Sequence, residues 1–420
     1  MKIFFISPDE RKLWNTAGDR APLGVGYLSS YCRKILNVDT QIFDLNHDSE
    51  DSFFDEIRKQ NPDFICVSVT TPSYLECLRL VKEIKNLGFN GKIIAGGNHI
   101  TDNPYEELTG KNYDYIVVGD GESALKKIIQ NETDSKVVIS EKADVDSVPW
   151  PDYEGLRFER YWMTLEGKKC AMIIGSRGCI YSCAFCGSAK IKKWRPRNPS
   201  DIVNEMKFLM DNYGIEAFYF GDDIFSFDRN RVFEICRLIK QNLKPVKLRI
   251  QTRVNLVDPE MLQKLKATGV DVISLGLESG DDQILRNIQK GATVDQARKA
   301  VKMIHDAGIK VKGFFIIGLP GDTRESVMRT IEFAKEINAD YVDFYLYTPY
   351  ASTPIWNNPE KYGMEIIKPV DSNWNEYYQV NPKDFSPKVW KVKHNNLSED
   401  EARELMELAK KTIMRLGQTI

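Results

Sequence analysis

Three cysteines of this chain lie close together, at Cys179, Cys183 and Cys186, in the spacing C-x3-C-x2-C. Three thiolates at such a spacing can hold three irons of a [4Fe–4S] cluster and leave the fourth iron open to another ligand. The alternative is a zinc knuckle, but a structural zinc site takes four protein ligands and no nearby histidine completes one. The spacing therefore favours an iron–sulfur cluster with an open iron.

The composition is that of an ordinary folded chain. Its 420 residues are 42% hydrophobic and 28% charged, with a net charge of −2, which favours two large domains and no polyanionic partner. Neither a transmembrane stretch of about 18 apolar residues nor a signal peptide is found. We therefore expect a cytoplasmic protein without membrane or nucleic-acid partners. Its eight cysteines indicate metal or redox chemistry more than a disulfide framework.

Other polar and glycine-rich motifs follow the three cysteines in order. They are Phe220-Gly221-Asp222-Asp223, Gln251-Thr252-Arg253-Val254-Asn255, Gly276-Leu277-Glu278-Ser279-Gly280, the stretch GFFIIGLPG from Gly313 to Gly321, and Tyr347-Thr348-Pro349-Tyr350. With Phe185 and Gly187 beside the last cysteine, this set resembles the radical S-adenosylmethionine (SAM) superfamily. The resemblance extends from about Lys2 to Pro354 and is to the cobalamin-binding, methyltransferase-like branch. It implies three cofactors: a [4Fe–4S] cluster, SAM and cobalamin.

The resemblance also implies which residues bind SAM. Asp222 and Asp223 replace the more usual Gly-Gly-Glu, and a carboxylate there can accept from the SAM ammonium group; Asp223 is favoured over Asp222. Arg253 is expected to pair with the SAM carboxylate or to contact the ribose. The remaining candidates are Glu278 and Ser279 for the ribose or ammonium group, and Ile317 and Gly318 for adenine. For each polar residue the alternative is a solvated loop position.

Alternating strand and helix patterns must position these residues. Residues 1–146 predict an α/β, Rossmann-like domain, whose first strand is Lys2–Ile6. The prolines around Trp150 stop regular structure, so 147–168 is read as a linker. Residues 169–354 then predict six βα repeats, a partial (β/α)6 TIM-like barrel with its catalytic face at the C-terminal strand ends. Residues 355–420 form a short C-terminal cap, whose last helix begins at the capping-box pattern from Ser398 to Glu401.

The first domain carries candidate cobalamin residues at the C-terminal ends of its strands, where a doubly wound sheet binds ligands. They are Leu23, Gly24, Ser68, Thr70, Thr71, Gly96, Gly97, His99, Gly119, Gly121 and Glu122. The alternative is an empty, vestigial fold. The loop from Asp9 to Trp14 lacks the histidine with which other cobalamin proteins ligate cobalt. Cobalamin is therefore expected with its base displaced and no histidine below the metal.

The function implied by the resemblance is methylation of an unactivated carbon by a 5′-deoxyadenosyl radical and methylcobalamin. Radical ring formation or rearrangement without methyl transfer is the enzymatic alternative, and a non-catalytic cobalamin or SAM sensor is the alternative of another class. An external one-electron reductant of flavodoxin or ferredoxin type is expected. The substrate is open among small molecules, peptides and proteins.

Overall fold

The computed structural model describes residues 1–11, 18–103, 112–190, 193–368 and 390–415. The described chain forms two compact units, and the change from the first to the second falls between Trp162 and Met163. That position lies within the predicted linker, 147–168. None of the helices in the described ranges is long and apolar enough to cross a membrane.

The first unit is built on a parallel sheet with strand order β2-β1-β3-β4-β5-β6. Its strands are β1 (Lys2–Ser7), β2 (Asp39–Asp44), β3 (Phe64–Ser68), β4 (Lys92–Gly96), β5 (Tyr115–Val118) and β6 (Val137–Ile139). The chain order reverses between β1 and β3, which makes a topological switch point at the C-terminal edge of the sheet. The predicted Rossmann-like fold is confirmed, and β6 is an additional strand.

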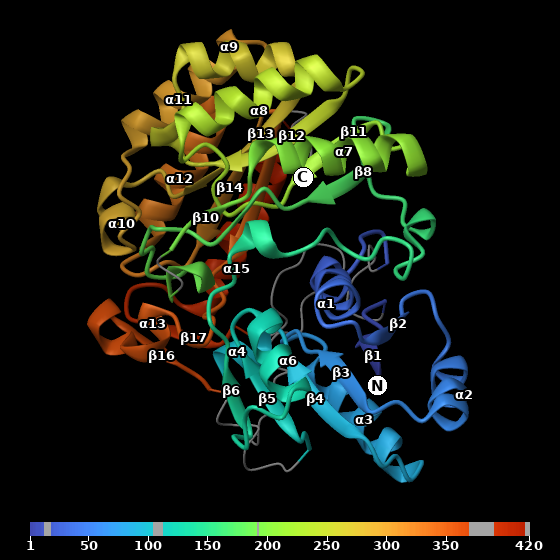
Figure 1. Cartoon of the computed structure of the whole chain (residues 1–420). Helices are drawn as coiled ribbons and strands as arrows, with labels where there is room; N and C mark the ends of the chain where they lie inside the picture. Colours follow the sequence, from blue (N-terminus) through green and yellow to red (C-terminus); the bar gives the residue numbers. More distant parts are fainter. Residues whose placement is uncertain (12–17, 104–111, 191–192, 369–389, 416–420) are drawn as a thin grey trace. The chain divides into compact units, whose positions relative to one another are not determined.

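Apolar packing explains why β1 lies in the middle of this sheet. Ile3, Phe4, Phe5 and Ile6 are all buried, at no more than 1% exposure, as expected for a parallel strand covered on both faces. The helices of the unit are α1 (Leu23–Lys34), α2 (Glu50–Gln60), α3 (Tyr74–Asn86), α4 (Asn98–Asp102) and α6 (Gly121–Ile129), of which α1 and α6 pack together (Figure 1).

The second unit contains a sheet with strand order β15-β14-β13-β12-β11-β8-β7. Its strands are β7 (Thr164–Leu165), β8 (Lys168–Ile173), β11 (Ala217–Phe220), β12 (Lys247–Thr252), β13 (Val270–Glu278), β14 (Lys310–Ile317) and β15 (Tyr341–Leu346). The strands from β8 to β15 pair in parallel, whereas β7 is an antiparallel edge. This is the predicted six-strand partial barrel, with a short edge strand added.

Alternating burial gives the barrel sheet two different faces. In β12, β14 and β15, buried residues alternate with half-buried ones, so one face is covered and the other lines the concave side. The covering helices are α7 (Pro199–Tyr213), α8 (Arg229–Asn242), α9 (Pro259–Thr268), α11 (Val294–Asp306) and α12 (Arg324–Ile337), along the outside of the sheet (Figure 1). The C-terminal strand ends thus open at one rim.

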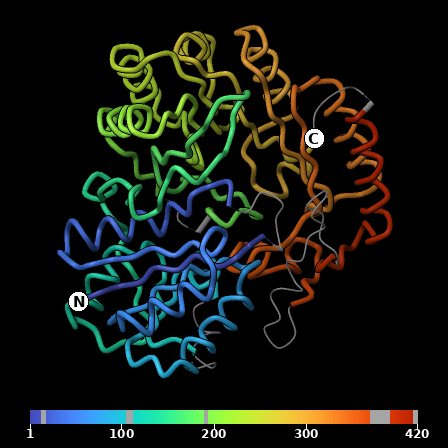
Figure 2. The backbone as a smooth tube through the Cα atoms, turned by 90° about the vertical axis from the view of Figure 1, so that its right-hand side faces the viewer, coloured from blue at the N-terminus to red at the C-terminus, as the bar shows by residue number. Residues whose placement is uncertain are grey.

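The C-terminal segment returns to the barrel. Helix α15 (Glu399–Arg415) packs on α12 and β15, and Figure 2 shows this last helix alongside the strands and helices that precede it. Its predicted capping box is confirmed: Ser398 Oγ accepts from the Glu401 amide at 3.3 Å, and Glu401 Oε2 accepts from the Ser398 amide at 3.1 Å. The middle of the predicted cap, 369–389, lies outside the described residues.

Candidate active site

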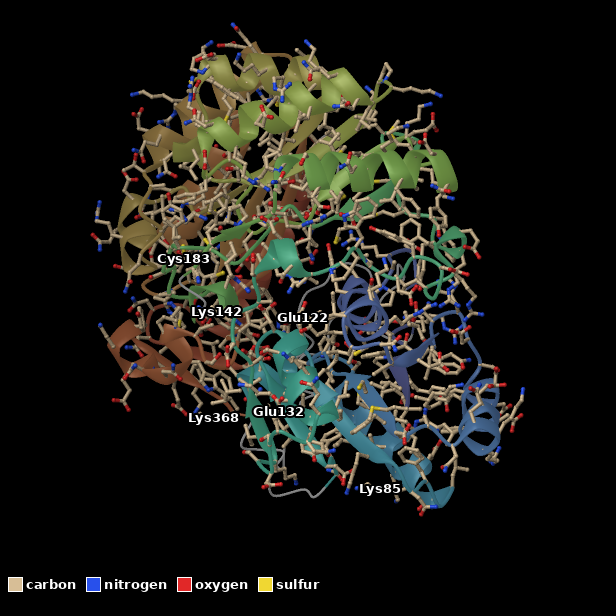
Figure 3. All side chains as sticks on the ribbon, viewed as in Figure 1. Lys85, Glu122, Glu132, Lys142, Cys183 and Lys368 are labelled. Atoms are coloured by element: carbon tan, nitrogen blue, oxygen red, sulfur yellow. The ribbon has the colours of Figure 1, made fainter. Side chains whose placement is uncertain are left out.

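The three cysteines lie in the loop that follows β8, at the C-terminal rim of the barrel. Cys183 is labelled in Figure 3. Cys186 and Cys183 are joined by a backbone turn, amide to carbonyl, at 3.1 Å. Ala184 fastens the loop on both sides, because its amide donates to the Ile288 carbonyl at 2.8 Å and its carbonyl accepts from the Ile355 amide at 3.2 Å. Segments far along the chain therefore hold the loop in place.

The three thiols share one electrostatic environment. Burial raises the pKa of Cys179 and of Cys186 above the ordinary value, and the neighbouring charges of Cys183 and Asp223 raise both pKa values further. Thiolates held so close together need a cationic partner. No three His, Cys, Asp or Glu side chains of the described ranges converge on a site for one metal ion, whereas the thiolates of a cubane each bind a different iron. The residues fit a [4Fe–4S] cluster held by three ligands.

Asp222 supports the start of this loop. Its carboxylate accepts from the Gly175 amide at 2.7 Å and from Ser176 Oγ at 2.6 Å. It is 1% exposed, and burial raises its pKa against the lowering effect of the Arg231 cation. Both oxygens therefore serve the protein, and Asp222 has little surface for a ligand.

Asp223 has a different environment, although it is the next residue. Ser188 Oγ donates to its carboxylate at 3.0 Å, and its charge reaches Cys179 and Cys186. Enclosure by the surrounding loop raises its pKa, although the side chain keeps an exposed face. Of the two predicted carboxylates, Asp223 is thus the one that lies beside the cysteines and is exposed to a ligand.

Arg253, at the end of β12, is turned toward the cysteine loop. Its Nη1 donates to Cys183 Sγ at 3.4 Å, its Nη2 donates to the Lys290 carbonyl, and its guanidinium lies 3.7 Å from the centre of the Tyr181 ring. The side chain is 7% exposed. Its predicted contact with SAM stays a prediction, because the observed partners are protein groups.

Glu278 and Ser279, at the end of β13, are also engaged by the protein. Glu278 has a positive φ of 64° beside a register shift against β14, and its carboxylate pairs with Lys290 Nζ at 2.7 Å in a buried ion pair. Ser279 Oγ lies 3.1 Å from Thr330 Oγ1 of α12. Both side chains therefore hold neighbouring segments of the protein together at the rim.

Gly318 and Ile317 end β14, where the family resemblance places adenine. Ile317 is fully buried. Gly318 has φ +88°, and a Cβ there would lie 2.4 Å from Trp390 Cζ2, so this glycine admits the indole as well as the turn. Trp390 is itself fastened by its Nε1, which donates to the Tyr347 carbonyl at 2.9 Å.

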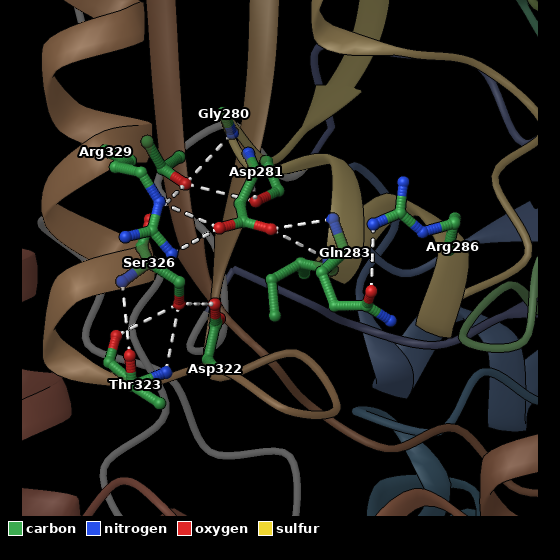
Figure 4. A network of polar contacts seen from close by, with 11 residues as sticks. Gly280, Asp281, Gln283, Arg286, Asp322, Thr323, Ser326 and Arg329 are labelled. Atoms are coloured by element: carbon green, nitrogen blue, oxygen red, sulfur yellow. Dashed lines mark hydrogen bonds and ion pairs between the residues drawn. The ribbon is translucent and has the colours of Figure 1, made fainter.

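A buried carboxylate shapes the same turn. Asp322 Oδ2 accepts from the amides of Gly318 and Leu319, both at 2.9 Å. Its Oδ1 accepts from Ser326 Oγ at 2.7 Å (Figure 4). Burial raises the pKa of Asp322 to about 6. This residue follows the GLPG motif directly, and that position was the signal by which it could have been found.

The candidate cobalamin edge of the first unit presents exposed glycines. Gly24, in the first turn of α1, has no neighbouring atom within 4 Å of the position of an added Cβ. Gly97 and Gly119, which follow β4 and β5, are exposed and have φ of 108° and 93°. A Cβ on Gly97 would meet the Val69 backbone, so this glycine also serves the packing of its turn, whereas the open backbone at Gly24 and Gly119 fits a large ligand. Gly96 lies beside Gly97, at the end of β4.

Polar side chains gather at the switch point between β1 and β3. Thr70 Oγ1 donates to Glu10 Oε1 at 2.7 Å and lies 2.7 Å from Ser73 Oγ. Burial raises the pKa of Glu10. Ser68 and Thr71, which flank this group, are half-buried. Glu10 is not among the predicted residues, because a single carboxylate in a loop carries no motif.

The other candidates of this unit face its interior. Leu23 is buried, and His99 is fully buried against Tyr74, with ring centroids 4.3 Å apart; burial lowers the pKa of His99 to about 4. A Cβ on Gly121 would lie 2.7 Å from Leu28, so this glycine serves the contact between α1 and α6. Glu122, at the start of α6 (Figure 3), is buried. Burial raises the pKa of Cys32, and the neighbouring Glu122 raises it further.

Comparison with known proteins divides the chain in the same way. Residues 13–129 match the B12 binding domain, and residues 173–334 match the radical SAM superfamily. An uncharacterized methyltransferase of Pyrococcus horikoshii is 31% identical over 424 residues, which cover 94% of this chain and 88% of that protein.

Two further proteins bear on chemistry and fold. An anaerobic magnesium-protoporphyrin IX monomethyl ester cyclase of Cereibacter sphaeroides is 28% identical over 85% of this chain and 63% of its own length. The solved structure of TsrM from Kitasatospora setae, a radical SAM methyltransferase with cobalamin and a [4Fe–4S] cluster bound, superposes with a TM-score of 0.76 at 16% identity, covering 99% of this chain and 88% of that one. At this identity the likeness establishes the fold.

Proposed function

Since this chain belongs to the cobalamin-binding branch of the radical SAM superfamily, we propose that it is a C-methyltransferase that places a methyl group on an unactivated carbon. The observation that carries the proposal is the match over nearly its whole length to a protein described as a methyltransferase. The three-cysteine loop and the exposed glycine edge support it. When bound, the cofactors supply the hard chemistry: SAM cleaved at the cluster yields a hydrogen-abstracting radical, and cobalamin carries the methyl group.

The residues of the barrel rim do the positioning. Cys179, Cys183 and Cys186 hold the cluster and leave its fourth iron for the amino and carboxylate groups of SAM. Asp223 accepts from the SAM ammonium group, since its carboxylate lies beside Cys179 and Cys186 and keeps an exposed face. Asp222 holds the loop that carries them, through Gly175 and Ser176.

The first unit holds cobalamin at its C-terminal sheet edge. Gly24 and Gly119 let the ligand approach the backbone, the exposed Gly97 follows β4, and Thr70 offers a hydroxyl at the switch point. An external one-electron donor of flavodoxin or ferredoxin type reduces the cluster. The substrate is a small molecule, a peptide or a protein residue.

A second enzymatic outcome is ring formation, which the cyclase relative favours. The ratio of products distinguishes the two. Methyl transfer consumes two SAM molecules per turnover, so deoxyadenosine and S-adenosylhomocysteine form in equal amounts and the substrate gains the labelled methyl group. Ring closure forms deoxyadenosine without S-adenosylhomocysteine. Anaerobic incubation of candidate substrate pools with methyl-labelled SAM, analysed by mass spectrometry, tests the proposal.

A further inference from the structure

Arg253 is a buried cation that forms no ion pair with a carboxylate among the described parts of the chain. Among the residues that the structure describes, its nitrogens contact the Cys183 sulfur, the Lys290 carbonyl and, through Nε at 3.4 Å, Asn255 Oδ1. One face of the guanidinium lies over the Tyr181 ring. A buried charge is costly unless an anion compensates it. The Cys183 sulfur is the one of these contacts that would carry negative charge as a cluster ligand.

A chain of buried groups fixes the guanidinium in this place. Lys290, whose carbonyl accepts from Arg253, is held through its own ammonium by Glu278, and both side chains of that pair are 8% exposed. The same turn supplies the Ile288 carbonyl, which binds the Ala184 amide of the cysteine loop. Arg253 and the loop thus share one support.

We infer that Arg253 is a positioning residue that donates a hydrogen bond to the Cys183 ligand and makes the cluster easier to reduce, instead of binding the SAM carboxylate. The inference rests on the proposed function, because it needs the cluster to be present.

The charges indicate the direction of the effect. A cubane core of charge 2+ with three thiolates carries a net charge of −1, and one electron from the external donor makes it −2 with no proton transferred. A fixed cation and a hydrogen bond to a ligand sulfur stabilise the more negative state, and such contacts are among the factors that set cluster potentials. Removing Arg253 should therefore shift the potential to more negative values.

The test is a dithionite titration of the reconstituted full-length chain, without SAM or cobalamin, followed by electron paramagnetic resonance of the reduced cluster. Arg253→Gln removes the positive charge. Arg253→Lys keeps the charge but lacks the planar guanidinium with its several N–H donors. Arg249→Gln is the matched control, because Arg249 lies on the same strand, where it contacts Ser274 and Tyr219. Iron content and SAM affinity are measured for every variant.

For Arg253→Gln we expect the ratio of reduced to oxidised cluster at a fixed potential to fall about tenfold, which is about 59 mV for one electron. Arg253→Lys should lie between this variant and the wild type, Arg249→Gln should match the wild type, and SAM affinity should change less than twofold. If Arg253→Gln does not load iron, Arg253→Lys decides alone.

The inference is overturned if either Arg253 variant keeps the wild-type potential and binds SAM tenfold or more weakly. Arg253 would then be assigned to the SAM carboxylate. A wild-type chain that binds no iron contradicts the proposed function instead, so the two failures are distinguishable.

Discussion

Asp222 and Asp223 are consecutive carboxylates with opposite surroundings. The two oxygens of Asp222 accept hydrogen bonds from the Gly175 amide and from the Ser176 hydroxyl. Asp223 lies beside the cysteines, and its carboxylate accepts a hydrogen bond from Ser188 Oγ. Both carboxylates lie in the loop that follows β11, where Asp222 is buried and Asp223 is exposed. Asp223 is therefore the carboxylate that we propose for SAM.

Replacement of these two residues should separate stability from SAM binding. Asp222→Ala removes the buried acceptor of the Gly175 amide and the Ser176 hydroxyl, and a buried donor left unsatisfied costs about 1–3 kcal/mol. We expect a lower free energy of unfolding and poor iron loading. Asp223→Asn should keep the wild-type melting temperature and iron content but weaken SAM binding about tenfold. Equal loss of stability in both variants would show that the assignment is wrong.

Cys183→Ala should abolish the cluster. With two thiolates left, the loop holds too few irons for a stable cubane, so iron analysis should fall from about four per chain and SAM cleavage to deoxyadenosine should stop. Cys236→Ala is the control, since Cys236 is buried in α8 away from the loop. Full deoxyadenosine formation by Cys183→Ala would refute the cluster assignment.

Gly24 offers a variant that blocks cobalamin without straining the fold. An added side chain meets no atom within 4 Å in the free protein, and replacing glycine within a helix generally adds about 0.5–1 kcal/mol of stability for alanine. Gly24→Leu should keep its melting temperature and lose cobalamin affinity tenfold or more, by equilibrium dialysis. Ser52→Leu, in the first turn of α2, is the control. Unchanged cobalamin binding by Gly24→Leu would show that cobalamin does not bind against α1.

Asp322 predicts a pH dependence of stability. Its pKa is about 6 in the folded chain against an ordinary 3.8, so between these values the folded state binds more protons than the unfolded state. The free energy of unfolding therefore falls as pH rises from about 4 to about 6, by about 2 kcal/mol on the scale of 1.36 kcal/mol per pKa unit.

Asp322→Asn should remove this contribution. Its amide oxygen can still accept from Gly318 and Leu319, and its NH2 group can donate to Ser326. Urea unfolding of both proteins at pH 5 and pH 7 isolates the effect, because other groups titrate equally in both. We expect Asp322→Asn to lose less stability than the wild type between these pH values. Identical losses would exclude Asp322 as the titrating group.

Much of the fold could be predicted because strands and helices alternate with strong apolar periods. The strands Val137–Ile139 and Thr164–Leu165 were not predicted, because a strand of two or three residues is too short to show an alternation of apolar and polar residues. The cysteine spacing predicted the cluster loop directly. The contacts of Arg253 with Cys183 and of Gly318 with Trp390 join residues 70 or more positions apart, and no local pattern encodes such pairs. Hence the strand-end residues were expected to face SAM, whereas Asp222, Glu278 and Ser279 contact other protein groups in the structure.

The proposed function requires this chain to move a methyl group from SAM to cobalamin, and this step can be measured without knowing the substrate. The full-length chain, with cluster and cobalamin bound and reduced, is incubated anaerobically with SAM carrying a CD3 group. Mass spectrometry should find cobalamin bearing CD3 and S-adenosylhomocysteine in equal amounts, and Gly24→Leu should form neither. Cobalamin that stays unlabelled while SAM is cleaved to deoxyadenosine would contradict the proposed function.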